Sequence, residues 1–292
     1  MANPLLLDGK AAAKAVLAEL ARRVADLGTR GVRPCLRILQ VGSDAASSIY
    51  VASKEKASAK VGIDARVERL PESSELADVA RVIGVWNQDP SVHGFIVQLP
   101  LPREIDSQTA LGLTNPTKDV DGLSPASLGA LMAGRPGFMP ATPSGIIELL
   151  LLNGITIPGK RVVIVGRGEL VGRPLASMLL LKGERGDATV TVCHSRTRDL
   201  GAVCRTAEIL VVAAGRAGLV TGETVSDGVV VVDAGTNSIG GKLVGDVDFE
   251  SVAAKASAIT PVPGGVGPMT VAMLLANTVK AAELASGISI RE

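Results

Sequence analysis

The chain has 292 residues, and its 30 basic and 29 acidic residues leave a formal net charge of +1. This length allows two domains, and a composition that is 47% hydrophobic but only 2% aromatic suits an α/β protein with central strands covered on both faces. The balanced charge argues against a nucleic-acid partner, and no uncharged stretch is long enough to span a membrane.

Helical and strand-like patterns alternate along the first half of the chain. Helical spacing covers residues 9–27, 46–61 and 76–87, and the segments 35–41, 63–70 and 94–99 are typical of strands. This alternation predicts βαβ units and a largely parallel sheet. Four prolines then indicate a loop-rich crossing to the second half, at positions 100, 102, 116 and 125.

The second half repeats the alternation. A helix is predicted over 144–152, followed by strands over 161–165, 189–193, 209–213 and 229–233 and a last short strand over 258–260. The final helix, 269–284, has no strand after it. It is therefore free to pack back onto the first domain, which would make that domain discontinuous.

In the first domain, Tyr50 and Lys54 lie four residues apart on a predicted helix, so both project from one face and can share a substrate. Tyr50 is the only tyrosine of the chain. Lys54 can act as a base near neutral pH only where burial or a neighbouring charge lowers its pKa from about 10.4. A surface lysine with a tyrosine packed along its stem is the alternative.

Two further polar positions stand out before the second domain. Gln98 ends the strand 94–99, and the carboxyl end of a buried parallel strand is where such sheets bind ligands. Asp119 and Asp121 straddle a valine in the crossing region. Solvated turn residues are the alternative interpretation of both features.

A glycine-rich turn follows the strand 161–165. Gly166 and Gly168 allow a tight turn and close approach of a pyrophosphate, and Gly172 lies one residue later than the third glycine of the commonest dinucleotide fingerprint. Glycines in this pattern are weak evidence alone. The strand before the turn, the helix after it and a second strand at the expected distance strengthen the prediction of a dinucleotide site.

The end of that second strand indicates which dinucleotide binds. NAD sites usually place a carboxylate here for the ribose hydroxyls, but this chain continues from Cys193 with His194, Ser195 and Arg196. Together with Arg167 in the glycine turn, these hydroxyl and guanidinium groups favour a 2′-phosphate, and therefore NADP over NAD. The alternative is that both arginines are solvated surface charges.

The segment 260–270 reads Thr-Pro-Val-Pro-Gly-Gly-Val-Gly-Pro-Met-Thr. Its prolines fix φ and its glycines open conformations closed to other residues, and a helix is predicted directly after it. Such a loop lets a ligand approach bare backbone N–H groups. An ordinary tight connection explains the same residues equally well.

These segments, taken in order, resemble one family over nearly the whole chain. The matching motifs are Val41-Gly42-Ser43 with Ser47, Tyr50 and Lys54; Val97-Gln98-Leu99-Pro100-Leu101-Pro102; Lys118-Asp119-Val120-Asp121-Gly122; Thr142-Pro143 with Gly145; Val165-Gly166-Arg167; Gly245-Asp246-Val247; and the segment 260–270. They are similar to the bifunctional methylenetetrahydrofolate dehydrogenase/methenyltetrahydrofolate cyclohydrolase family.

The resemblance implies a two-domain α/β protein with a cleft between a substrate domain and a Rossmann-like NADP-binding domain. The substrate domain would cover residues 1–139, completed by 270–292, and the NADP domain residues 140–269. The implied activity is NADP-dependent oxidation of 5,10-methylenetetrahydrofolate, followed by hydrolysis of the product to 10-formyltetrahydrofolate. The implied assembly is a homodimer, with a folate as substrate, no metal, and no nucleic-acid or membrane partner.

The resemblance also assigns roles to residues. Lys54 would be the central catalytic residue, Tyr50 would lie over the pterin, Gln98 would tune Lys54 and Asp121 would anchor the pterin edge. The remaining substrate-binding residues would be Val97, Leu99, Pro263, Gly264, Gly265 and Thr270, and the cofactor-binding residues would be Gly166, Arg167, Gly168, Ser195, Arg196 and Thr236.

The chain departs from the family pattern at several positions. The common Pro-Cys-Thr-Pro is Pro140-Ala141-Thr142-Pro143, the usual Gly-Arg-Ser ends in Gly168, Thr236 replaces an aliphatic residue, and the segment 182–187 is longer than usual.

Three other classes of protein are alternatives. A short-chain reductase would place its tyrosine after the glycine turn, whereas Tyr50 precedes Gly166. A shikimate-dehydrogenase-like enzyme leaves Gln98 and the loop 263–270 unexplained. A redox-sensing regulator would need a DNA-binding helix pair or a basic face, and the sequence indicates neither.

The cysteines and the first residues indicate a compartment. Cys35, Cys193 and Cys204 are odd in number and lack metal-ligand spacing, which fits buried thiols in a reducing environment. The opening residues lack the basic segment of a signal peptide. We therefore expect a soluble cytoplasmic protein.

Overall fold

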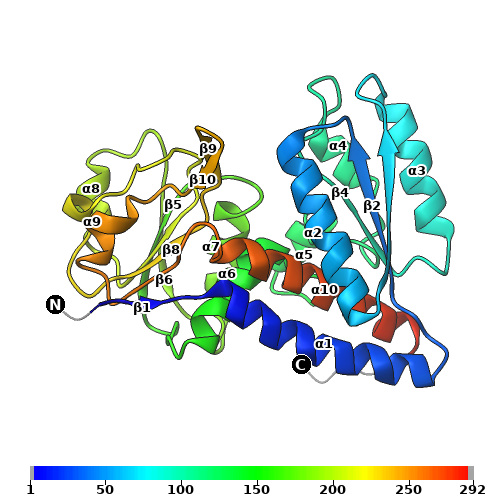
Figure 1. Cartoon of the computed structure of the whole chain (residues 1–292), viewed down its shortest axis with the longest axis horizontal. Helices are drawn as coiled ribbons and strands as arrows, with labels where there is room; N and C mark the ends of the chain where they lie inside the picture. The colour runs from blue at the N-terminus through cyan, green and yellow to red at the C-terminus, as the bar shows by residue number, and fades with distance from the viewer. Residues whose placement is uncertain (1–2, 289–292) are drawn as a thin grey trace. The chain divides into compact units, whose positions relative to one another are not determined.

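The computed structural model describes residues 3–288, which form two compact units (Figure 1). The first unit comprises Lys14–Ala141 and the chain from Val271 on, and the second comprises the chain up to Ala13 together with Thr142–Thr270. Within the described range, no helix has both the length and the apolar composition needed to cross a membrane.

The first unit contains a parallel sheet with the strand order β3–β2–β4. Its strands are β2 (Cys35–Val41), β3 (Asp64–Leu70) and β4 (Gly94–Val97), and its helices are α2 (Ala45–Val61), α3 (Leu76–Gln88), α4 (Ser107–Gly112), α5 (Pro125–Met132) and most of α1 (Gly9–Thr29) and α10 (Val266–Ala285). In this parallel arrangement the strands end at one edge, where α2 begins shortly after β2.

Local chemistry explains where α2 begins and ends. The Asp44 carboxylate accepts a hydrogen bond from Ser47 N, which satisfies one of the free N–H groups at the helix start. Gly62 ends the helix in the left-handed conformation, with φ of 87°. These two signals fix the helix that carries Tyr50 and Lys54.

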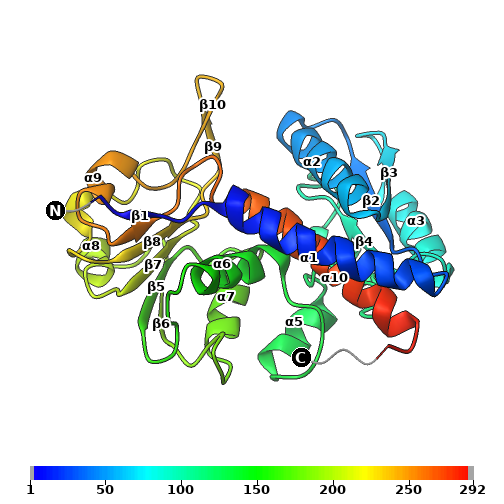
Figure 2. The same cartoon turned by 60° about the horizontal axis from the view of Figure 1, so that its bottom comes forward.

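The final helix belongs to the core of the first unit, as predicted. Leu274, Leu275 and Val279 of α10 are fully or nearly fully buried in one cluster with Leu36 and Ile38 of β2. Figures 1 and 2 both show α10 running beside α1, where Arg23 donates to the Glu283 carboxylate at 2.9 and 2.6 Å. Burial of the apolar face explains why the helix returns to this unit.

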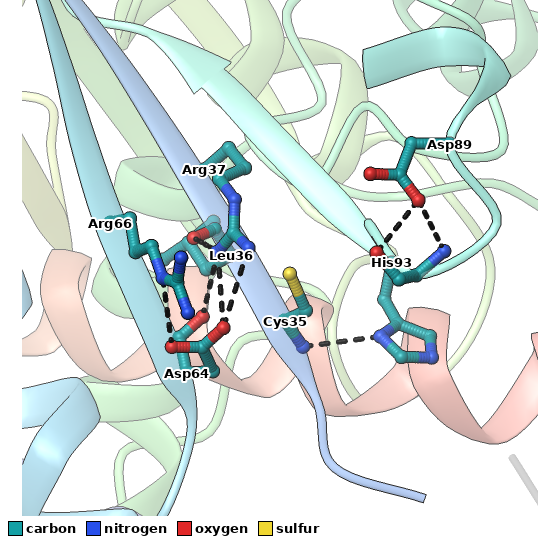
Figure 3. A network of polar contacts seen from close by, with 8 residues as sticks. Cys35, Leu36, Arg37, Asp64, Arg66, Asp89 and His93 are labelled. Atoms are coloured by element: carbon teal, nitrogen blue, oxygen red, sulfur yellow. Dashed lines mark hydrogen bonds and ion pairs between the residues drawn. The ribbon is translucent and has the colours of Figure 1, made fainter. Parts of the chain in front are cut away.

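The amino ends of β2 and β3 carry a separate polar network (Figure 3). Cys35 N donates to Nδ1 of His93 at 3.1 Å, and Arg37 forms an ion pair with Asp64 at 3.3 Å. Burial and the charge of Lys118 lower the pKa of His93, which favours the neutral ring that can accept this bond. Cys35 is buried, and burial raises the pKa of its thiol, which disfavours the reactive thiolate.

The second unit contains a parallel sheet with the order β1–β11–β8–β7–β5–β6. Its strands are β1 (Leu5–Leu6), β5 (Arg161–Val165), β6 (Thr189–Cys193), β7 (Ile209–Val212), β8 (Val230–Asp233) and β11 (Ala258–Ile259). Its helices are α6 (Ala141–Leu152), α7 (Gly172–Leu179), α8 (Leu200–Cys204), α9 (Phe249–Ala253) and the short 3-10 helix η1 (Gly222–Thr224). After β5 the chain first adds β6 on one side and later β7 on the other, which creates a topological switch point.

Several elements differ from the sequence prediction. β4 ends at Val97, so Gln98 follows the strand instead of ending it, and α10 begins at Val266, within the loop expected to precede it. β1 was not expected; it pairs with β11, and the chain up to Ala13 accordingly lies in the second unit. The antiparallel hairpin of β9 (Asn237–Ile239) and β10 (Lys242–Val244), which Figure 2 shows extending from the sheet, was also not expected.

Asn277 of α10 should contribute measurably to stability. Its buried side-chain amide donates to Val120 O and Met139 O, both at 2.9 Å. Asn277→Ala leaves two carbonyl groups without this donor, and we expect it to lower the free energy of unfolding by about 2 kcal/mol. Urea unfolding measures the effect. Leu284→Ala, at a position on the same helix that is 53% exposed, is the matched control and should cost clearly less.

Candidate active site

Lys54 lies on α2 with its side chain buried. Its ammonium Nζ donates to Oε1 of Gln98 at 2.9 Å, and its backbone carbonyl accepts the hydroxyl of the fully buried Ser58 at 2.8 Å. Gln98 directly follows β4, and its backbone N–H donates to Leu39 O of β2 at 2.8 Å. The hydrogen bond between Lys54 and Gln98 therefore connects α2 to the sheet of the first unit.

The amide of Gln98 is held at both of its polar atoms. Its Nε2 donates to Leu99 O at 2.7 Å, which leaves Oε1 for Lys54. An amide oxygen accepts a hydrogen bond from either an ammonium or a neutral amine, so this contact survives loss of the lysine proton. Burial lowers the pKa of Lys54, and the attraction of Asp121 opposes that shift.

Asp121 lies on a turn whose shape is fixed by the buried carboxylate of Asp119. Asp119 accepts hydrogen bonds from Gly122 N at 3.0 Å, Ser124 N at 2.9 Å and the Ser127 hydroxyl at 2.6 Å. Gly122 has φ of 69°, and a Cβ at this position would lie 2.7 Å from Pro140 N. The turn therefore requires this glycine, and it places Asp121 close enough to Lys54 for their charges to interact.

The electrostatic environment of Asp121 is unusual for a carboxylate. Burial raises its pKa from 3.8 to about 6; the positive charge of Lys54 opposes this rise and the negative charge of Asp119 adds to it. A lysine with a lowered pKa therefore lies beside an aspartate with a raised pKa, and each shift disfavours the charged form of its own group. Such pairs concentrate at catalytic sites.

The other predicted residues of the first unit surround this pair. Tyr50 is half-buried one helical turn before Lys54, and burial raises the pKa of its phenol. Val97 is buried in β4, whereas Leu99 is half-buried and its carbonyl accepts the Ser47 hydroxyl at 3.5 Å as well as the Gln98 amide. Because these polar groups bond to one another, Leu99 offers a ligand chiefly its side chain.

The glycine turn after β5 is shaped by close backbone contacts. Gly166 has φ of 127°, and a Cβ there would lie 2.0 Å from Ala213 O. A Cβ on Gly172 would lie 2.1 Å from Gly166 O, so both positions exclude side chains. Gly168 differs, because no atom lies within 4 Å of its Cβ position. Its backbone is therefore open to a bound group.

The groups around this turn fit a dinucleotide that carries an extra phosphate. Ser195 and Arg196 are exposed in the turn after β6, where Arg196 N donates to Nδ1 of His194 at 3.1 Å, and Arg167 is exposed in the glycine turn. The nearest following carboxylate, Asp199, accepts Ala202 N at 3.0 Å and caps α8. Cationic and hydroxyl groups thus stand where an NAD site would place a carboxylate.

Two family models together match nearly the whole chain. The catalytic domain of tetrahydrofolate dehydrogenase/cyclohydrolase matches residues 7–121, and the NAD(P)-binding domain of the same family matches residues 140–286. The chain belongs to this family. The resemblance found from the sequence motifs is confirmed, and so is the two-domain α/β fold.

Relatives of the family cover the chain almost completely. The bifunctional protein FolD of Moorella thermoacetica is 50% identical over 278 residues, which are 95% of this chain and 98% of that protein. The crystal structure of FolD from Campylobacter jejuni has 47% identity and a TM-score of 0.92, covering 96% of this chain and 98% of that one. The FolD structure from Trypanosoma brucei, complexed with NADP cofactor and an inhibitor, has 40% identity and a TM-score of 0.92 over 98% and 99% of the two chains.

The rival shikimate-type interpretation has a much weaker match. A shikimate dehydrogenase structure in complex with NADP⁺ reaches a TM-score of 0.53 at 14% identity, which reflects a shared fold alone. The family assignment, by contrast, extends through both domains of the chain.

The remaining predicted substrate-binding residues of this family member lie in the second unit, in the segment 263–270. Gly264 has φ of 112°, and its carbonyl accepts Lys10 N at 3.1 Å. A Cβ on Gly9 would approach closer than 2 Å to Gly265 O, which shows how tightly the segment packs against the start of α1. The Thr270 hydroxyl donates to Thr142 at 3.0 Å, whereas Pro263 and Thr236 are exposed.

Two functional features of this family member escaped the sequence analysis. Asp119 was noted only as a partner of Asp121, although it holds the whole turn; the small residues Gly122 and Ser124 just after it were the available signal. Ser47 was quoted as a motif residue without a role, yet it is buried and reaches Leu99 O. Among the residues described, no group of histidine, cysteine, aspartate and glutamate side chains could hold a metal ion.

Asp121 should lower stability at neutral pH. In the folded chain its carboxyl keeps a proton up to about pH 6, whereas the ordinary value is 3.8. Between these values the folded state binds more protons than the unfolded state, so the contribution of Asp121 to stability falls as pH rises. We expect Asp121→Asn to be more stable than the wild type at pH 7, with a difference that shrinks toward zero near pH 4. Urea unfolding at both pH values measures this, and an equal difference at both would contradict it.

Proposed function

We propose that the chain oxidises 5,10-methylenetetrahydrofolate to 5,10-methenyltetrahydrofolate with NADP and then hydrolyses this product to 10-formyltetrahydrofolate. The observation that carries the proposal is the buried Lys54 ammonium, bonded to Gln98 and within electrostatic reach of Asp121. Membership of the family supports both activities, and the roles of the individual residues rest on the geometry of the first unit.

Oxidation requires alignment of the substrate more than it requires a base. Loss of hydride from the methylene carbon leaves an amidinium cation that the two adjacent nitrogens stabilise. NADP, when bound, supplies the hydride acceptor. Tyr50 offers a half-buried aromatic face for the pterin one turn before Lys54. A cation forming beside Lys54 further disfavours the protonated lysine, which agrees with the direction in which burial shifts its pKa.

Hydrolysis requires removal of a proton from water. The water oxygen bonds to the methenyl carbon and one carbon–nitrogen bond breaks, which leaves the formyl group on N10 and returns a proton to N5. The neutral amine of Lys54 accepts the proton lost by water, and Oε1 of Gln98 holds the nitrogen in place before and after this transfer. Asp121, on the turn fixed by Asp119, would hold the pterin edge.

The preference for NADP rests on the turn after β6. Ser195 and Arg196 are exposed there, and Asp199 is bonded to the start of α8 and does not occupy the place of a ribose-binding carboxylate. A guanidinium group matches the charge and the forked geometry of a 2′-phosphate. Gly166, Gly168, Arg167 and Thr236 complete the proposed cofactor set.

Further parts of the proposal extend beyond the site. Pro263, Gly264, Gly265 and Thr270 stay predicted substrate-binding residues, and the left-handed Gly264 supports access of a ligand to backbone groups there. A homodimer is proposed on the family resemblance. A cytoplasmic location is proposed because Cys35, Cys193 and Cys204 are all unpaired and buried thiols.

Lys54→Met tests the proposed base. Methionine fills similar space without an exchangeable proton, so we expect hydrolysis of methenyltetrahydrofolate to fall by at least about 100-fold and NADP-dependent oxidation to fall less. Both rates are followed spectrophotometrically. Lys56→Met changes an exposed lysine of the same helix and is the matched control. Unchanged hydrolysis in Lys54→Met would remove Lys54 from the mechanism.

Arg196→Ala tests the proposed phosphate contact. Loss of one charge-assisted hydrogen bond should raise KM for NADP⁺ by about 10-fold, with little change in KM for NAD⁺. Arg198→Ala, two residues away and also exposed, is the matched control. Equal effects of Arg196→Ala on both cofactors would show that this arginine does not read the phosphate.

A further inference from the structure

Two buried aspartates connect the loops at the carboxyl ends of β7 and β8. Asp246 is fully buried and Asp233, the last residue of β8, is 4% exposed. Neither aspartate is part of the glycine-rich dinucleotide fingerprint. Asp246 belongs to the motif Gly245-Asp246-Val247. The ends of β7 and β8 lie on the far side of the switch point from β6.

Asp246 is saturated by donors from two loops. Its Oδ2 accepts Ala214 N at 2.6 Å and Gly215 N at 2.8 Å, directly after β7, and its Oδ1 accepts Nδ2 of Asn237 at 2.8 Å. The same loop packs on the glycine turn, because Ala213 N donates to Val165 O at 2.8 Å. The carboxylate therefore links the β7 loop to the start of the β9–β10 hairpin.

Asp233 holds the chain around Asp246 from the other side. Its carboxylate accepts Gly235 N at 2.8 Å, Asp246 N at 3.0 Å and Val247 N at 2.9 Å. A Cβ on Gly245 would lie within 2 Å of Asp233 Oδ2, and a Cβ on Gly235 would lie 2.5 Å from Asp246 N. Only glycine fits at these two positions, because any larger residue would collide with Asp233 or Asp246.

The position of Asp246 has a chemical consequence. Two successive backbone N–H groups, such as those of Ala214 and Gly215, form a concavity that binds anions. Here the carboxylate of the protein itself occupies that concavity, so a phosphate finds neither free donors nor a favourable charge at this loop. The glycine turn after β5 keeps an open backbone at Gly168, and α7 begins directly after it.

We propose that Asp246 is a positioning residue for the cofactor: it fills the anion-binding turn of the β7 loop and fixes that loop to receive the nicotinamide riboside end of the dinucleotide, which needs no anion-binding turn. The phosphates are thereby left to the glycine turn and to the side of β6, where Ser195 and Arg196 lie. This inference rests on the proposed function, because it takes NADP as the ligand of the second unit.

The exposure of the loop fits this role. Ala214 and Gly215 are exposed although their N–H groups point to a buried carboxylate, so the outer side of the loop is available to a ligand. Gly215 has φ of 66°, the left-handed conformation that glycine adopts without strain. Thr236, between Gly235 and Asn237, is exposed on the neighbouring loop.

Calorimetric titration with NADP⁺ and with 2′,5′-ADP tests the inference, because 2′,5′-ADP lacks the nicotinamide end. Asp246→Asn replaces one acceptor oxygen by a donor, and we expect it to weaken NADP⁺ binding by about 10-fold while 2′,5′-ADP binding keeps the wild-type affinity. Asp248→Asn, at an exposed position two residues away, is the matched control and should bind both ligands as the wild type does.

An exchange variant separates positioning from a general loss of structure. In Asp246→Asn combined with Asn237→Asp, the new amide can still accept from the β7 loop and donate to the new carboxylate, so NADP⁺ affinity should largely recover. If Asp246→Asn fails to fold, as judged by circular dichroism, Asn237→Ala carries the test by the same two titrations, because it removes the donor to Oδ1 of Asp246. Weaker binding of NADP⁺ alone would support the role, and an equal effect on both ligands or on neither would overturn it.

The outcomes distinguish this inference from the proposed function. Equal weakening of NADP⁺ and 2′,5′-ADP, or no weakening of either, would overturn the role of Asp246 while leaving NADP as the cofactor. Failure of the wild type to bind NADP⁺ would overturn the cofactor assignment and this inference with it. Selective loss of NADP⁺ affinity that the exchange variant restores would establish the role.

Discussion

Desolvation of the Lys54 ammonium is the constraint on which the chemistry of the first unit depends. A charged group out of water is costly unless it is paired or gives up its proton. The chain supplies a neutral acceptor, Gln98 Oε1, and a carboxylate, Asp121, that attracts the ammonium but is itself raised in pKa. Burial lowers the pKa of Lys54 and the attraction of Asp121 opposes that shift, so the net effect favours the neutral amine relative to a solvated lysine. The cap of α2 at Asp44 and the extension of β4 at Gln98 hold the two sides of this contact in place.

The aspartates of the chain divide into two kinds according to their donors. Asp119, Asp233 and Asp246 each accept three or more hydrogen bonds, most of them from backbone N–H groups, and each fixes the course of a loop. These hydrogen bonds make each carboxylate a structural anchor; at Asp233, burial raises the pKa of the carboxyl and the backbone donors oppose that rise. Burial raises the pKa of Asp121 to about 6, the positive charge of Lys54 opposes this rise and the negative charge of Asp119 adds to it, so its protonation can change with pH. Backbone donors identify the three loop anchors, whereas burial raises the pKa of both Asp121 and Asp233.

Much of this architecture could be predicted from periodicity, and the exceptions have a common cause. The strands 35–41 and 161–165 were predicted to the residue, because mostly apolar runs between clear breakers specify buried parallel strands. The strand 189–193 was also predicted to the residue, although only Cys193 of it is buried, because threonine and valine alternate in it. β1 consists of two exposed leucines whose strand conformation exists only through pairing with β11. Asp246 likewise meets its partners in the β7 loop 31 and 32 residues away, so no local pattern announces its role. Features made by distant pairing are those that local reasoning missed.

The proposed cofactor-binding positions differ in how strongly packing constrains the residue that they can hold. Gly166 and Gly172 are fixed by backbone contacts near 2 Å, so another residue would displace the turn. Gly168 has free space around its Cβ position, and Ser195, Arg196 and Thr236 are exposed. The departures from the family pattern at Gly168 and Thr236 therefore fall on positions that packing does not constrain. Variation there can alter the affinity for a dinucleotide without disturbing the loops that Asp233 and Asp246 hold, and cofactor preference can change while the scaffold is retained.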